Sequence, residues 1–198
     1  MRIGWLVTLA LLSAATLAQE AVPANAKRFR PLLTRQVHAL LGPLAPVPMF
    51  AGQIMQESRW RPNVTAWDNG RGLAQFMDGT ATMVARQFPQ LGHPMPYDPQ
   101  WAIPALIRYD MWLRQRVKGD TDCDRWSAAL KSYNAGLGFV QRAQRKSPQP
   151  GEWYDATEWV KSGQSAKNFE YSRMYPRWIM FKHQPSYASW GPTLCNKP

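Results

Sequence analysis

Apolar residues recur along this chain with the spacing of helical faces, and no convincing run alternates as a β-strand would. Proline, glycine and capping residues end each helical run after a short distance. About 180 residues follow the N-terminal segment, enough for one domain with a hydrophobic core, and 45% of the chain is apolar. The pattern predicts a mostly α, single compact domain, with helices at about 32–41, 47–58, 80–88, 98–117, 126–134 and 166–180 and a short basic helix ending at 146.

Capping and turn-forming residues predict where several elements begin. Asp98 followed by proline is typical of a helix start, with the aspartate as N-cap. Either Asp122 or Asp124 is expected to cap the next helix. The segment 65–72 is rich in turn formers and predicts a loop or a tight irregular hairpin.

The first eighteen residues have the layout of a secretory signal peptide. A basic start precedes a short apolar stretch, and the small residues Thr16 and Ala18 stand before the expected cleavage site. The apolar stretch is shorter than the roughly 20 residues of an ordinary spanning helix, although a slowly released signal anchor is the alternative. We therefore expect a signal peptide over 1–18 and a periplasmic mature domain over 19–198 that does not span the membrane.

Cys123 and Cys195 are the only cysteines in the chain. In an exported protein such a pair predicts a disulfide, which here ties the C-terminal tail back to the body of the domain. Closing a loop of this length contributes about 4 kcal/mol to stability on the chain-entropy model. Two free thiols are the alternative.

Glu57 is the only glutamate between positions 21 and 151, in a chain whose formal net charge is +11. It follows an apolar run over 48–55 and precedes Pro62, so we expect it in the last turn of a helix. Apolar surroundings and the partial negative charge of a helix C-terminus both raise the pKa of a carboxyl and keep it protonated near neutral pH. Such a group suits general acid catalysis. A residue that only ends a helix is the alternative.

Four blocks of sequence stand in order along the chain: Glu57-Ser58 with Pro62, Gly72-Leu73-Ala74-Gln75-Phe76-Met77 with Thr80, Ser132-Tyr133-Asn134-Ala135-Gly136, and Glu170-Tyr171-Ser172-Arg173-Met174-Tyr175. Together they resemble the soluble lytic transglycosylase (SLT) family, whose catalytic domain has a lysozyme-like fold. The fifteen-residue step from Glu57 to Gly72 is also similar to the spacing in that family. The resemblance covers about 47–180, most of the mature chain.

The resemblance implies a peptidoglycan lytic transglycosylase in which one carboxyl acts twice and no cofactor is needed. Glu57 would protonate the oxygen that links N-acetylmuramic acid to N-acetylglucosamine. As a carboxylate it would then take the proton of the muramoyl C6 hydroxyl, which attacks the anomeric carbon and gives a 1,6-anhydro sugar. Two-carboxylate glycosidases need a second acid, and the nearest in sequence, Asp68 and Asp78, are not compelling. A hydrolytic muramidase and a non-catalytic peptidoglycan-binding or scaffolding protein are the alternatives.

By the same resemblance, five further residues belong to the site. Gln75 matches a contact with the substrate amide, and Met77 matches its neighbour in the sugar-binding cleft of the family. Tyr133 and Asn134 match a Tyr-Asn pair near the acid, and Tyr175 matches the tyrosine that orients the acid. Three of them have a structural alternative to a role in the site. Met77 and Tyr133 are alternatively core residues, and Asn134 alternatively belongs to a helix C-cap.

Three other positions qualify the resemblance. Ser58 is a weak candidate for substrate binding, because a hydroxyl bonded to nearby helix backbone is its more expected role. Family members commonly have a serine where Ala66 stands and a proline where Asp78 stands. Both departures leave the acid in place and are expected to affect a sugar subsite or the rate.

The excess of basic residues favours an anionic partner. Peptidoglycan carries stem-peptide and lactyl carboxylates, so its glycan strands are the expected partner of a monomer, whereas export argues against nucleic acid. A solvated basic face without a partner is the alternative. Trp60 and Trp67 are candidates for stacking on sugar faces. The histidines, His38, His93 and His183, match no metal-ligand spacing and are expected at scattered surface positions.

Overall fold

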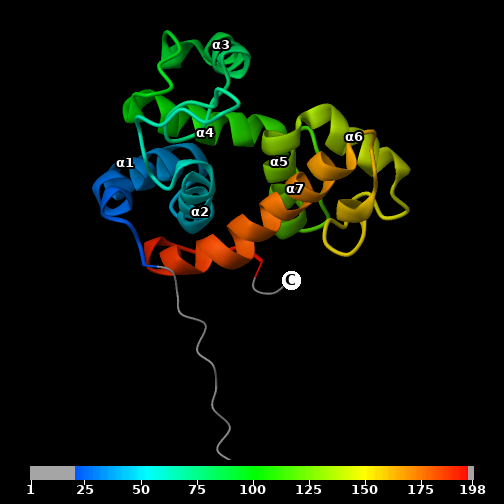
Figure 1. Cartoon of the computed structure of the whole chain (residues 1–198). Helices are drawn as coiled ribbons and strands as arrows, with labels where there is room; N and C mark the ends of the chain where they lie inside the picture. The colour runs from blue at the N-terminus through cyan, green and yellow to red at the C-terminus, as the bar shows by residue number, and fades with distance from the viewer. Residues whose placement is uncertain (1–20, 196–198) are drawn as a thin grey trace, which may run out of the picture.

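The regular secondary structure of the protein is almost entirely helical in the computed structural model, which describes residues 21–195 (Figure 1). The prediction of a mostly α fold is confirmed, whereas the expected signal peptide, residues 1–18, lies outside the described residues. Within 21–195 no helix combines the length and the hydropathy that crossing a membrane requires. The elements in chain order are α1 (Ala24–Leu41), α2 (Val47–Ser58), α3 (Asp78–Gln87), η1 (Pro89–Leu91), α4 (Pro99–Arg114), α5 (Asp122–Ala135), α6 (Leu137–Lys146), η2 (Thr157–Trp159), α7 (Ala166–Arg177), η3 (Trp178–His183) and η4 (Gln184–Trp190).

Helix α2 packs against α1 and against the segments η3 and η4, which cross beneath it in Figure 1. Its sequence carries no charged residue before Glu57, and a helix that is apolar on all sides is stable when it is enclosed. All residues over 47–55 are buried. The neighbouring backbone comes so close that a Cβ atom at Gly52 would lie 3.1 Å from the Gln184 nitrogen and 3.2 Å from the Ile179 oxygen. This packing fixes the position of the helix that carries Glu57.

The chain turns sharply at the end of α2. Arg59 and Trp60 adopt left-handed conformations, with φ of 53° and 61°, and fold the Trp60 ring back into the core. Its indole Nε1 donates a hydrogen bond to the Tyr187 hydroxyl at 2.8 Å, and its ring lies 5.9 Å from that of Trp190. The prediction that Trp60 stacks on sugars is wrong, because the ring is fully buried, whereas Trp67 is 96% exposed.

The segment after α2 forms a tight irregular hairpin, as its turn-forming residues predict. Isolated bridges pair Thr65 with Arg71 and Arg71 with Phe76. Gly72 has a φ of +70°, and a Cβ atom there would lie 1.9 Å from the Pro96 oxygen. Only glycine fits this position, which lets the hairpin rest on the loop that precedes α4.

Helix α4 begins where the sequence predicts, whereas α5 begins earlier. Asp98 caps α4 and accepts a hydrogen bond from the Gln100 nitrogen at 2.8 Å. The cap of α5 is Thr121 rather than Asp122 or Asp124. The Thr121 hydroxyl accepts from the Asp124 nitrogen while the Asp124 carboxylate accepts from the Thr121 nitrogen. This capping box satisfies two backbone donors at once, which a lone aspartate cap does not.

Two other helices differ in extent from the prediction. Helix α1 begins at Ala24 rather than near 32, and Ala26 and Phe29 extend its buried face. The helix expected over 166–180 is divided into two segments in the structure. The first, α7, ends at Arg177, and the chain continues as the π-helical segment η3. Pro176 lacks a backbone donor, which disrupts the regular α ladder near this junction.

A disulfide joins Cys123, at the start of α5, to Cys195 near the end of the described chain. The predicted bond is therefore present. The side-chain amide of Gln184 holds the same tail, because it donates to the Leu194 oxygen at 2.6 Å and accepts from the Leu194 nitrogen at 3.0 Å. The tail is thus fixed to η4, which in turn supports α2.

Candidate active site

Glu57 stands in the last turn of α2, as predicted, and its side chain is partly exposed. Desolvation by the surrounding side chains raises the pKa of this carboxyl from 4.5 to about 8. A hydrogen bond from Tyr175 lowers the pKa, and the negative charge of Asp68 raises it, but both effects are smaller than that of burial. Glu57 therefore holds its proton at neutral pH, and the residue as a whole keeps some exposed surface.

Tyr175 reaches Glu57 from α7. Its hydroxyl donates a hydrogen bond to Glu57 Oε1 across 118 residues of sequence. Only 1% of the Tyr175 surface is exposed, and burial holds the pKa of its hydroxyl well above the usual value. The phenol therefore remains a donor over the whole physiological pH range and fixes the orientation of the carboxyl.

Tyr133, on α5, is a second tyrosine that interacts electrostatically with the acid. Its hydroxyl donates to the backbone oxygen of Ala74 at 2.6 Å, and its ring lies 6.0 Å from Phe76 and 5.4 Å from Tyr109. Burial, and then the negative charge of Glu57, raise the pKa of the phenol well above its usual value. Tyr133 thus joins α5 to the end of the hairpin within electrostatic reach of Glu57.

The remaining predicted contacts differ in exposure. Gln75 has a φ of 51° and its side-chain nitrogen donates to the Gly72 oxygen at 2.8 Å, so the amide folds back onto its own turn and is only partly exposed. Met77 is 43% exposed, whereas its neighbour Phe76 is in the core. Asn134, next to Tyr133, is also exposed. The side chains of Met77 and Asn134 are therefore accessible to a ligand, and the side chain of Gln75 is partly accessible.

Ser58 does not belong to an exposed binding surface. It is buried, and its hydroxyl donates to the Ile54 oxygen at 3.3 Å, one turn back in α2. This is the backbone bond that its position at a helix end predicts.

The two carboxylates nearest in sequence have different surroundings. Asp78 forms an ion pair with Arg71 at 2.5 Å and is largely exposed. Asp68 accepts a hydrogen bond from the Gly70 nitrogen at 3.2 Å inside the hairpin turn, and its charge reaches Glu57. Ala66, which stands where the family resemblance predicts a serine, donates a hydrogen bond from its backbone nitrogen to the Gly70 oxygen in the same turn.

Asp110 is an acidic neighbour of Glu57 that sequence reasoning missed. It lies on α4 with no exposed surface, and its Oδ1 accepts a long hydrogen bond, 3.4 Å, from Gln53 Nε2. Its Oδ2 has no hydrogen-bond partner. Burial raises the pKa of Asp110 well above its usual value, and the charge of Glu57 adds to the rise. A signal was present in the sequence, because Asp110 lies three residues from both Ile107 and Leu113 on a buried helical stripe.

His183 also lies close to the site rather than at the surface. It is 5% exposed on η3, and its Nε2 lies 2.9 Å from the Gln56 side-chain oxygen. The expectation of a surface position is wrong for this histidine, because η3 packs on α2 and encloses the ring. His183 thereby anchors the residue that precedes Glu57.

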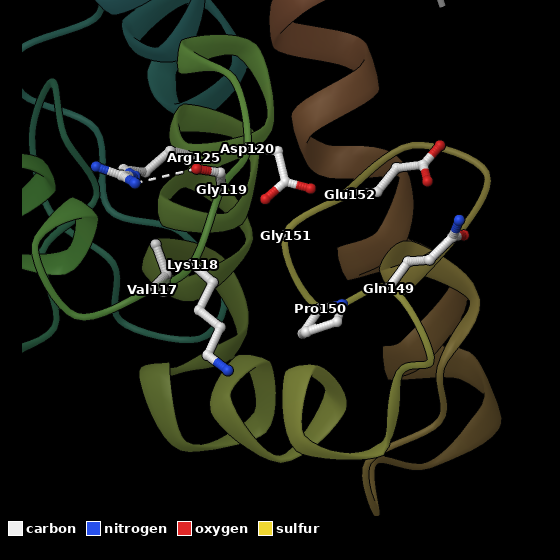
Figure 2. A pocket seen from close by; sticks show the side chains of 9 residues that line it. All are labelled: Val117, Lys118, Gly119, Asp120, Arg125, Gln149, Pro150, Gly151 and Glu152. Atoms are coloured by element: carbon white, nitrogen blue, oxygen red, sulfur yellow. Dashed lines mark hydrogen bonds between the residues drawn. The ribbon is translucent and has the colours of Figure 1, made fainter.

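A separate cavity of about 470 Å³ lies at the opposite end of α5 from Tyr133 (Figure 2). Helix α5 has 14 residues, which corresponds to a length of about 20 Å. Charged side chains of both signs line the cavity, and Arg125 is held by the Gly119 oxygen at 3.0 Å. None of the predicted site residues is among the nine that line it, namely Val117, Lys118, Gly119, Asp120, Arg125, Gln149, Pro150, Gly151 and Glu152.

Comparison with known proteins gives a consistent assignment. Residues 45–156 match the family model described as Transglycosylase SLT domain. The membrane-bound lytic murein transglycosylase F 1 of Alkalilimnicola ehrlichii is 33% identical over 105 residues, which are 52% of this chain and 19% of that protein. The membrane-bound lytic murein transglycosylase F of Shewanella halifaxensis is 30% identical over 129 residues, which are 63% of this chain and 26% of that protein. The chain thus spans about a quarter or less of the length of these relatives.

Proposed function

The chain belongs to the transglycosylase SLT domain family, and we propose that it is a peptidoglycan lytic transglycosylase. It cleaves the β-1,4 bond between N-acetylmuramic acid and N-acetylglucosamine and leaves a 1,6-anhydromuramoyl end. The observation that carries the proposal is Glu57, a residue with some exposed surface whose carboxyl has a pKa of about 8 and so stays protonated at neutral pH. The names of the relatives, lytic murein transglycosylases, support the same class of substrate.

In the first step Glu57 donates its proton to the glycosidic oxygen as the bond from that oxygen to the muramoyl anomeric carbon breaks. The bonding electron pair leaves with the N-acetylglucosamine hydroxyl. The carbonyl oxygen of the substrate's own N-acetyl group stabilises the cation at the anomeric carbon. Glu57 is then a carboxylate, and the hydrogen bond from Tyr175 favours this charged form.

In the second step the muramoyl C6 hydroxyl oxygen attacks the anomeric carbon and closes the anhydro ring. Glu57 takes the proton of that hydroxyl and returns to its acid form. No water is consumed, so the two products together have the composition of the substrate. A pKa near the working pH suits a group that must both give and accept a proton.

The positions of the other carboxyl groups support attack by C6 over attack by water. A hydrolase of the two-carboxylate type needs a second carboxylate that water and the sugar can approach. Asp110 has no exposed surface, and Asp78 is paired with Arg71. Asp68 remains as the nearest accessible acid, and its oxygen is engaged with the hairpin backbone.

In this proposal the glycan strand lies on exposed residues that follow the hairpin and end α5. Met77 and Asn134 contact the sugars directly, and Gln75 offers its side-chain oxygen to a substrate amide while its nitrogen holds the Gly72 oxygen. Tyr133 positions this loop through its bond to Ala74. The assigned contacts thus come from the hairpin and α5, while the acid comes from α2.

The formal net charge of +11 supports an anionic polymer as the partner. Basic side chains such as Arg145 and Lys146 at the end of α6 are exposed and attract the carboxylates of peptidoglycan. This attraction holds the protein on its polymeric substrate without adding specificity. We place the mature protein in the periplasm as a monomer.

Digestion of purified peptidoglycan in heavy-oxygen water tests the reaction, with mass spectrometry of the released muropeptides. Intramolecular attack by C6 gives anhydromuramoyl ends that are one water lighter than reducing ends and carry no heavy oxygen. Reducing ends labelled with heavy oxygen would identify a hydrolytic muramidase. Folded protein that releases no muropeptides would identify a protein that only binds the glycan.

A further inference from the structure

The cavity near the start of α5 has two walls that hydrogen bonds hold together (Figure 2). One wall is the segment 117–120, which leads into α5, and the other is the loop 149–152. The Asp120 nitrogen donates a hydrogen bond to the Gly151 oxygen at 2.9 Å and so joins the two walls directly. The cavity is therefore part of the folded framework rather than a gap between two separate segments.

Gln144, on α6, ties the same two walls together from a buried position. Its Oε1 accepts a hydrogen bond from the Lys118 nitrogen at 3.1 Å, and its Nε2 donates to the Lys118 oxygen at 2.8 Å. The same Nε2 also donates to the Pro150 oxygen at 3.1 Å. Because the walls are already ordered in this way, the binding of a ligand between them loses little backbone freedom.

Gly151 lets an acidic side chain lie against the loop. A Cβ atom at this position would overlap the Asp120 carboxylate, so a side chain here would displace that carboxylate. Figure 2 shows the Asp120 carboxylate between the segment that leads into α5 and Gly151. The missing side chain at 151 thus leaves the acid in place as part of the cavity lining.

The lining carries two basic and two acidic side chains, and no ion pair joins any of them within residues 21–195. These exposed residues are Lys118, Arg125, Asp120 and Glu152. Just outside the lining, by contrast, Asp122 pairs with Arg114 at 2.5 Å. The chain has 24 basic and 13 acidic residues, so a shortage of bases does not explain why the two acids of the lining are unpaired.

Charges of both signs restrict the chemistry of a ligand for this cavity. A polyanion would be repelled by Asp120 and Glu152, and a polycation would be repelled by Lys118 and Arg125. A zwitterion places one favourable charge against each pair. The volume of about 470 Å³ lies within the range of about 300 to 1,000 Å³ that is typical of small-molecule sites. Gln149, also in the lining, has a side-chain amide that both donates and accepts, as a peptide group does.

We propose that this cavity is a binding site for a short zwitterionic peptide. The terminal carboxylate of the peptide lies against Lys118 and Arg125, and its terminal ammonium group lies against Asp120 and Glu152. The Gln149 amide bonds the peptide group between these two ends. The inference goes beyond the proposed function and does not depend on it, because the cavity contains none of the residues assigned to glycan cleavage or glycan binding.

Calorimetric titration of the wild type with alanylalanine tests the site. N-acetylalanylalanine and alanylalanine amide are the matched probes, because each lacks one of the two charges. The unmodified dipeptide should bind saturably, and each blocked probe should bind roughly threefold to tenfold more weakly, since each loses a charge-assisted contact. Free alanine has both charges but no peptide group, and it should also bind more weakly than the dipeptide.

Variants assign each end of the peptide to its partners. In the double variant Asp120→Asn with Glu152→Gln, acetylation of the peptide should no longer reduce the affinity, because the ammonium group has already lost its partners. In Lys118→Gln, amidation should reduce the affinity less than it does in the wild type. Asp122→Asn and Lys146→Gln are the controls, because both residues are exposed but lie outside the lining. Both controls should keep the wild-type pattern.

Absence of saturable alanylalanine binding to the wild type would overturn the proposal. Equal affinity for the dipeptide and both blocked probes would also contradict it, because the charges would then play no part. A control variant that loses as much affinity as the lining variants would show that the peptide binds elsewhere. The titrations contain no glycan, so their failure leaves the proposed transglycosylase reaction standing, and failure of that reaction leaves the peptide site standing.

Discussion

The Tyr175 hydroxyl donates a hydrogen bond to the Glu57 carboxyl and so joins α7 to the end of α2. Two opposing effects meet at this pair, because burial favours the protonated acid and the phenol favours the carboxylate. Burial is the larger effect and leaves the pKa at about 8. The hydrogen bond from Tyr175 therefore limits the rise in the Glu57 pKa that burial causes, and it holds the carboxyl in one orientation.

Tyr175→Phe removes this bond and should raise the Glu57 pKa further, since the carboxylate loses its donor. The alkaline limb of the pH–rate profile should move to higher pH, and kcat should fall by roughly tenfold as the orientation is lost. Tyr154→Phe is the control, because that phenol is partly buried and accepts a hydrogen bond from Ser127, away from Glu57. An alkaline limb of the pH–rate profile that stays in place, or moves to lower pH, would show that the hydrogen bond from Tyr175 does not lower the Glu57 pKa.

Glu57 should make the fold less stable as pH rises. Its folded-state pKa of about 8 lies above the ordinary value of 4.5 for a glutamate, so between these values the folded state binds a proton that the unfolded state has released. The free energy of unfolding therefore falls with rising pH across this window. Glu57→Gln removes this dependence and should be more stable by about 1 to 2 kcal/mol near pH 8, a value reduced for partial exposure, with little difference near pH 4. Urea unfolding at several pH values measures it, and a Gln variant that loses stability as steeply as the wild type would contradict the assignment.

Asp110→Asn should fold at least as stably as the wild type at neutral pH. The buried Asp110 keeps its proton because its pKa is well above the usual value, and asparagine has nearly the same shape without a charge to bury. The same linkage argument gives a stability gain that grows with pH above about 4. Asp110→Ala is the contrasting variant, because it leaves a cavity and removes the partner of Gln53. A large loss of stability in Asp110→Asn would mean that the carboxyl is ionised and paired.

Reduction of the Cys123–Cys195 bond should destabilise the domain by about 4 kcal/mol on the chain-entropy model, because the loop spans 72 residues. Thermal unfolding with and without reductant measures the effect. The double variant Cys123→Ser with Cys195→Ser is the control, since reductant should not change its melting temperature. Equal unfolding of oxidised and reduced wild type would show that the bond contributes nothing.

The place of Glu57 could be predicted from sequence because it depends on local rules. Prolines begin α2, an apolar run forms it, and Pro62 stands just past its end, so the last turn is encoded within a short window. Tyr133 and Tyr175 are different, because only the resemblance to a family indicated them. Their partners, Ala74 and Glu57, lie 59 and 118 residues away, and such pairings are set by tertiary packing.

Other features depended on burial, which a sequence pattern does not fully determine. Trp60 and Trp67 stand seven positions apart, yet left-handed residues turn the first into the core and a hairpin turn displays the second. Asp110 is the only fully buried aspartate of residues 21–195, and its position on a buried helical stripe is the one sequence signal that distinguishes it. Thr121 was missed as a cap because two aspartates follow it, and the choice among them depends on backbone conformation.

The central claim is that the Glu57 carboxyl itself performs the proton transfers. The direct measurement is release of anhydromuropeptides from peptidoglycan by wild type and Glu57→Gln, with circular dichroism and hexasaccharide affinity confirming that the variant is folded and binds glycan. Glutamine keeps the shape of the side chain but has no acidic proton to give, so release should fall by at least roughly a hundredfold. Release of anhydromuropeptides at the wild-type rate by folded Glu57→Gln would contradict the account.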